Sequence, residues 1–122
     1  MIVALVDASN VRRSTWPNIA AEELPMLVGR WAEGEGEGVH AVLVFDGPAP
    51  TVDDAGPVEL VSTAEESADD WIARRASELR ARPGERFWLV TSDRGLRARA
   101  ASGAERTIGG GTFARALLAL RP

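Results

Sequence analysis

The stretch Ile2-Val3-Ala4-Leu5-Val6-Asp7 places an uninterrupted apolar run directly before a carboxylate. Such a run is typical of a β-strand that is covered on both faces, as in a parallel sheet. Two later segments follow the same pattern: Val39 to Phe45 is followed by Asp46, and Arg86 to Thr91 is followed by Ser92-Asp93. The sequence therefore predicts three strands of one parallel sheet, each with an aspartate at its carboxyl end.

Amphipathic segments alternate with these strands. Apolar spacing predicts four helices and two further short strands: helices at 20–33, 64–81, 94–102 and 112–120, and strands at 58–61 and 105–108. Pro25 is expected to break or kink the first helix, and Pro83-Gly84 to stop the second. Alternating strands and helices imply right-handed crossovers, so we expect an α/β fold: a mostly parallel sheet of about five strands between two helical layers.

The composition excludes several classes of protein. The chain has 122 residues, 45% of them hydrophobic and 26% charged, which suits a single domain spanning 1–122. It has no cysteine, so disulfide scaffolds and thiolate zinc sites are excluded, and one histidine cannot build a multi-histidine metal site. A net charge of −4 means that any nucleic-acid contact must use a local patch. No apolar run reaches the roughly 18 residues of a membrane helix, and the start has no leader pattern, so we expect a cytoplasmic protein without membrane contact.

The aspartates that follow the strands are the main functional candidates. Parallel sheets bind ligands at the carboxyl ends of their strands, so Asp7, Asp46 and Asp93 are expected at one rim. Helical phase adds a fourth acid. With the apolar stripe centred on Ile72, Asp69 lies about 60° from its centre, whereas Asp70 lies about 160° away and faces water. Glu66, at about 120°, is ambiguous by the same phase.

Clustered carboxylates repel one another and raise each other's pKa unless a cation joins them. Oxygen ligands without cysteine or histidine favour Mg²⁺ or Mn²⁺ over zinc, and such an ion suits phosphodiester hydrolysis. Each side chain also has a plain structural interpretation. Asp7, Asp46 and Asn10 suit turns, Asp93 and Ser92 suit a helix N-cap, Asp69 complements a helix dipole, and Glu66 completes a capping box with Thr63.

Four motifs resemble those of the NYN domains, the PIN-like ribonuclease superfamily that includes the YacP-like proteins. Val6-Asp7-Ala8-Ser9-Asn10-Val11 resembles the opening VDGxN motif, except that Ala8-Ser9 replaces the usual glycine and its neighbour. Three further matches follow in family order between residue 3 and about residue 97: Val44-Phe45-Asp46-Gly47, Glu66-Ser67-Ala68-Asp69-Asp70-Trp71-Ile72 (compare ETADxxI) and Val90-Thr91-Ser92-Asp93.

The resemblance implies a PIN-like three-layer α/β/α sandwich and metal-dependent cleavage of RNA. Carried over by position, the catalytic and metal-binding acids would be Asp7, Asp69 and Asp93, with Asp46 as a further metal ligand at the rim. Asn10 and Glu66 match supporting positions of the same motifs, and Ser92 is a further supporting candidate because its hydroxyl could contact phosphate.

Arginines and one tryptophan flank these motifs. All 14 basic residues are arginine. Arg12 and Arg13 follow Asn10, and Arg94 and Arg97 follow Asp93, so these guanidinium groups are candidates for phosphate contacts that carry no sequence preference. Trp16, in the loop after the first strand, is a candidate for stacking on an unpaired base. The alternatives are solvated surface charges and a tryptophan that packs its own loop.

These features lead to one preferred function and two others. We expect a Mg²⁺- or Mn²⁺-dependent ribonuclease, acting as an endonuclease on single-stranded or flexible RNA. A catalytically degenerate RNA- or protein-binding module is the main alternative. An aspartyl-phosphate regulatory domain ranks last, because such a site needs a lysine and the chain has none. The sequence leaves open a homodimer or another protein partner.

Overall fold

A computed structural model describes residues 1–52 and 56–122 of the chain. Its centre is one five-stranded sheet in which every pair of neighbouring strands is parallel, with the order β3-β2-β1-β4-β5. The strands are β1 (Ile2–Asp7), β2 (Val39–Asp46), β3 (Val58–Thr63), β4 (Arg86–Val90) and β5 (Arg106–Ile108). The predicted parallel α/β sheet of about five strands is confirmed.

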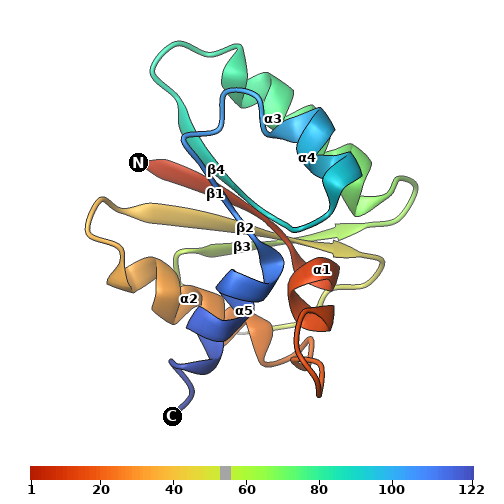
Figure 1. Ribbon diagram of the computed structural model, residues 1–122, viewed down its shortest axis with the longest axis vertical. Coiled ribbons are helices and arrows are strands. Elements are labelled where there is room, and N and C mark those ends of the chain that lie inside the picture. The colour runs from red at the N-terminus through yellow and green to blue at the C-terminus, as the bar shows by residue number, and fades with distance from the viewer. Residues whose placement is uncertain (53–55) are drawn as a thin grey trace.

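The helices lie in two layers on opposite faces of the sheet (Figure 1). They are α1 (Ala8–Arg13), α2 (Leu24–Gly34), α3 (Ala68–Arg80), α4 (Arg94–Ala100) and α5 (Gly110–Leu118). Figure 1 shows α3 and α4 on one face, and α1, α2 and α5 on the other. None of the helices in the described part of the chain combines the length and the apolar character needed to span a bilayer.

The burial of β1 explains its apolar sequence. Ile2, Ala4 and Val6 face the core under α1, α2 and α5, whereas Leu5 faces the core under α3 and α4. Successive side chains of a strand point to opposite faces, so a strand with helices on both sides needs apolar residues at consecutive positions. β1 lies between β2 and β4, and the chain moves from β1 toward β3 before it crosses back to β4. The carboxyl ends of β1 and β4 therefore lie at the switch point where such sheets bind ligands.

Two predicted helices begin about one turn late, and the last, predicted at 112–120, is shifted to Gly110–Leu118. The helix expected at 20–33 begins only at Leu24, and Pro25 lies in its first turn, where a missing N–H breaks no helical hydrogen bond. The helix expected from 64 begins at Ala68 because the Ser67 hydroxyl accepts a hydrogen bond from the Asp70 N–H and caps it. β3 extends to Thr63, so the suggested capping box with Glu66 does not form.

The short helix α1 was not predicted at all. It follows β1 without a loop, and Asp7 is both the last residue of the strand and the N-cap of this helix. Six residues are too few to show a helical period in the sequence. As a result Asn10 lies on a helix at the rim of the sheet rather than in a turn.

Candidate active site

Asp7 is held at the carboxyl end of the central strand. Its side chain is 5% exposed. One carboxylate oxygen accepts a hydrogen bond from the Thr91 hydroxyl at 3.0 Å, and the other accepts from the Asn10 N–H at 3.4 Å. The second contact caps α1, so the structural interpretation of Asp7 and a role at the rim are compatible.

Asp93 lies beside Asp7 because Thr91 contacts both residues. The Thr91 hydroxyl donates to the Asp7 carboxylate and accepts from the Asp93 N–H at 3.1 Å. Thr91 is fully buried, so its bond to the Asp7 carboxylate is shielded from water. The Asp93 carboxylate is exposed and accepts from the Leu96 N–H at 2.8 Å, which caps α4. The sequence predicts no function for Thr91, and its place two residues before Asp93 is the one local signal of its role.

Asp46 and Asp69 complete an acidic cleft. Asp46 is the exposed last residue of β2, and Asp69 is a half-buried residue in the first turn of α3. As helical phase predicted, the neighbouring Asp70 is exposed, and it pairs with Arg99 at 2.8 Å. The cleft has a volume of about 180 Å³ and is lined by Asp7, Ser9, Asn10, Arg13, Asp46, Ser67, Ala68, Asp69 and Asp93. Ser9 and Ser67 were not predicted as lining residues.

The carboxylates of the cleft interact electrostatically. The pKa of Asp7 is raised, first by burial and then by the negative charges of Asp69 and Asp93, although the hydrogen bonds from Thr91 and Asn10 oppose the shift. The pKa of Asp69 is also raised, first by burial and then by Asp93, while Arg99 acts in the opposite direction. Ionising the cleft therefore costs free energy, and a bound cation would offset that cost.

Asn10 and Ser92 join three elements at the edge of the cleft. The side-chain oxygen of Asn10 accepts from the Ser92 N–H at 2.9 Å, and the Ser92 hydroxyl accepts from the Gly110 N–H at 2.7 Å. Ser92 thus binds the first turn of α5, rather than the following helix α4 that the cap interpretation named. A Cβ atom at Gly110 would lie 2.1 Å from the Asn10 side-chain oxygen, so the close approach of α5 requires glycine.

The other predicted residues lie outside the lining of the cleft. Glu66 forms an ion pair with Arg74. Two arginines bind backbone carbonyls, Arg12 that of Ile19 at 2.8 Å and Arg97 that of Thr91 at 2.8 Å. Arg94 is exposed in the first turn of α4. Trp16 is 89% exposed, so the alternative that it packs its own loop is wrong. Of the predicted RNA contacts, Arg13 lines the cleft itself.

The donor set of the cleft fits Mg²⁺ or Mn²⁺. Its acids are all aspartates from four separate segments, and hard divalent cations prefer oxygen ligands. In the described ranges, no three His, Asp or Glu side chains are arranged so that they could hold a metal ion as they stand. Binding of an ion would therefore require carboxylates to rotate toward a common point.

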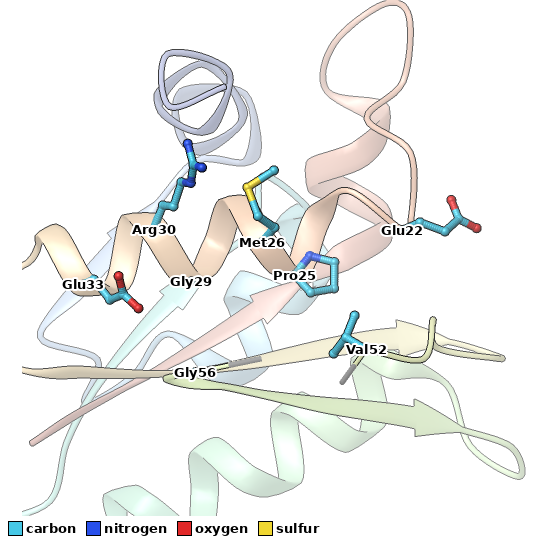
Figure 2. A pocket seen from close by; sticks show the side chains of 8 residues that line it. All are labelled: Glu22, Pro25, Met26, Gly29, Arg30, Glu33, Val52 and Gly56. Carbon is cyan, nitrogen blue, oxygen red and sulfur yellow. The ribbon is translucent and has the colours of Figure 1, made fainter. Parts of the chain in front are cut away.

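A larger cavity, of about 280 Å³, lies elsewhere (Figure 2). Residues of α2 form one wall, and the other wall includes Val52 and Gly56, in the segment between β2 and β3. Its charged residues are Glu22, Arg30 and Glu33. Carboxylates do not converge there from several strand ends, so we place the candidate active site in the smaller acidic cleft.

Comparison with known proteins supports the fold. No family model and no curated protein sequence matches the chain. Among solved structures, Rae1 (YacP) from Bacillus subtilis is similar with a TM-score of 0.70 at 22% identity, covering 98% of this chain and 75% of that chain. A tryptophan-to-leucine mutant of the same protein gives 0.67 at 20% identity, covering 98% and 76%. At this identity the likeness establishes a shared α/β fold. The resemblance of the sequence motifs to YacP-like proteins is therefore supported for the fold alone.

Proposed function

We propose that this protein is a metal-dependent ribonuclease that cleaves RNA internally at the acidic cleft. The observation that carries the proposal is the convergence of Asp7, Asp46, Asp69 and Asp93 on one cleft at the carboxyl edge of the sheet. These four acids come from the last residues of β1 and β2, the N-cap of α4 and the first turn of α3, and capping α1 and α4 does not require Asp46 and Asp69 to lie at the same cleft. The fold shared with YacP agrees with the motif resemblance to the NYN ribonucleases.

Asp7, Asp69 and Asp93 would hold Mg²⁺ or Mn²⁺, with Asp46 as a further ligand at the open side. When bound, such an ion lowers the pKa of a coordinated water and neutralises charge on the phosphate. The protein's own part is positioning. Thr91 fixes Asp7 relative to Asp93, and Asn10 fixes the loop that carries Ser92 and Asp93. Arg13, the cation in the lining, is placed to contact a phosphate.

The test is cleavage of an unstructured RNA oligonucleotide with MgCl₂ or MnCl₂, with excess EDTA, and with Asp93→Asn. We expect internal cleavage with either ion, and none with EDTA or in the variant. Asp70→Asn is the matched control, because Asp70 neighbours a proposed ligand but is exposed and paired with Arg99. Full activity of purified Asp93→Asn, or full activity in EDTA, would refute the mechanism.

One observation favours a second function, a catalytically degenerate binding module. Asp7 caps α1 and Asp93 caps α4, so both carboxylates have a structural role that needs no metal. A degenerate module would bind RNA, or a protein, equally well in EDTA and show no turnover over long incubation. The proposed nuclease would instead lose both metal binding and cleavage when Asp93 is neutralised.

A further inference from the structure

Trp16 is the most exposed aromatic side chain in the described part of the chain. It is 89% exposed, whereas Trp88 is 3% exposed, and Trp31 and Trp71 are half-buried. A single exposed apolar residue needs no explanation by itself. The structure of its loop and its position three residues after Arg13 supply the argument.

The loop that carries Trp16 is pinned at both ends. The Arg12 side chain donates to the Ile19 carbonyl at 2.8 Å, and the Ile19 N–H donates to the Arg12 carbonyl at 3.3 Å. The Ile19 side chain is fully buried in the core, so these bonds fasten the loop to the body of the protein. A short loop held in this way presents Trp16 to solvent at a defined place, with little ordering left to occur on binding.

The loop also begins at the cleft. Arg13 lines the cleft and ends α1, and Trp16 follows three residues later. Three residues span at most about 11 Å between Cα atoms, so Trp16 lies within reach of a nucleotide adjoining the cleft. Arg13 would bind a phosphate between the two places. An exposed ring, a cation and an acidic catalytic cleft in this order suit a nucleic-acid strand.

We propose that Trp16 and Arg13 form a subsite that stacks an unpaired base next to the scissile phosphate, which makes single-stranded RNA the substrate. The inference rests on the proposed function, because the cleft defines where the strand is cut. An unpaired base can leave its neighbours and lie on the indole ring, whereas a base inside a duplex keeps both faces covered. Stacking on an aromatic ring is tolerant of sequence, so the subsite selects for strandedness rather than for a particular base.

The test measures binding by fluorescence anisotropy of a labelled uridine oligonucleotide and of a blunt RNA duplex. All proteins carry Asp93→Asn, so that the RNA stays intact. All binding reactions contain MgCl₂. We expect Trp16→Leu to weaken binding of the single strand about tenfold, Trp16→Phe to retain most of the affinity, and duplex binding to change little. Met26→Ala, which trims an exposed side chain on α2, is the control and should leave both affinities unchanged.

The inference is overturned if Trp16→Leu binds the single strand within about twofold of its parent, or loses affinity for the duplex to the same extent. The first result would point to a protein partner for Trp16. Cleavage assays with proteins that retain Asp93 separate the two proposals. If cleavage depends on metal but is unchanged by Trp16→Leu, the subsite proposal alone is refuted. If binding depends on Trp16 but no cleavage occurs, the nuclease proposal alone is refuted.

Discussion

The two ends of the central sheet shift the pKa values of their carboxylates in opposite directions. At the amino end, Arg86 binds Glu105 through two nitrogens at 2.6 and 2.7 Å, and binds Glu37 at 3.1 Å. Trp88 donates a further hydrogen bond to Glu105 at 3.3 Å. These contacts lower the pKa of Glu105, the bond from Arg86 being the largest cause. The acids of this end are matched by donors that favour their charge.

At the carboxyl end, Asp7 and Asp93 accept hydrogen bonds from uncharged groups but, among the described residues, not from arginine. Within residues 1–52 and 56–122, none of Asp7, Asp46, Asp69 and Asp93 takes part in an ion pair. Burial and mutual repulsion raise the pKa of Asp7 and of Asp69. The difference teaches that Glu105 is held in its charged form by Arg86, whereas the charges of Asp7 and Asp69 are opposed by their surroundings. Residues whose charge is opposed in this way are candidates for function.

The largest expected effect is the difference in cleavage rate when one acid at each end of the sheet is neutralised. Asp7→Asn should lower the rate of RNA cleavage at least about 100-fold, because it removes a proposed metal ligand. Glu105→Gln should leave the rate unchanged, because Glu105 lies at the opposite end of the sheet. Initial rates of both purified variants, with circular dichroism as the check on folding, decide the matter. Equal rates in the two variants would contradict a functional difference between the two ends.

The next largest effect tests the packing beside the acidic cleft. Gly110→Ala would drive a Cβ atom against the Asn10 side chain and break its bond to the Ser92 N–H. We expect a loss of about 1–3 kcal/mol in the free energy of unfolding, measured with urea, and slower cleavage. Gly111→Ala is the matched control, since its new Cβ would meet only Arg115 at 3.4 Å. A Gly110→Ala protein as stable and active as the control would show that this contact does not matter.

A smaller effect is expected from relieving repulsion in the cleft. Asp69→Asn should raise the melting temperature in EDTA at pH 7 by about 1–3 °C, because it removes a carboxylate whose pKa is raised. The same variant should lose the stabilisation that Mn²⁺ gives the parent protein. Asp70→Asn, whose parent residue pairs with Arg99, should gain no stability in EDTA. Thermal melts with and without Mn²⁺ measure both changes, and a destabilised Asp69→Asn protein would contradict the repulsion.

The smallest effect is a difference in pH dependence between the two ends. Asp7 and Asp69 have raised pKa values in the folded state, so they bind more protons than in the unfolded chain, and stability falls as pH rises from their ordinary value of 3.8 through the raised ones. Glu105 has a lowered pKa, so its contribution is present above its ordinary 4.5 and is lost as pH falls through the lowered value.

Single substitutions separate these two contributions. Asp69→Asn should weaken the loss of stability on the rising side, and Arg86→Gln should weaken the loss on the falling side. Urea denaturation at a series of pH values between about 3 and 7 measures each limb. If both substitutions changed the stability on the same side of the pH profile, the claim that the two ends shift carboxylate pKa values in opposite directions would be wrong.

The sequence alone determined the parallel α/β fold and the identity of the acids at the rim. Apolar runs ending in Asp7, Asp46 and Asp93 are local patterns, and a parallel sheet collects strand ends at one edge whatever the details of packing. The phase of Asp69 on its helix is local as well, which is why its place at the cleft could be predicted.

Only the tertiary structure decided how these acids are held. Thr91 and Asp7 lie 84 positions apart in the chain, and Ser92 and Asn10 lie 82 apart, so no local period indicates that they touch. The exposure of Trp16 likewise depends on how Arg12 and Ile19 close its loop. Local hydrophobic spacing determines which face of an element is buried, but hydrogen bonds between distant segments form only once the sheet and its helices have brought those segments together.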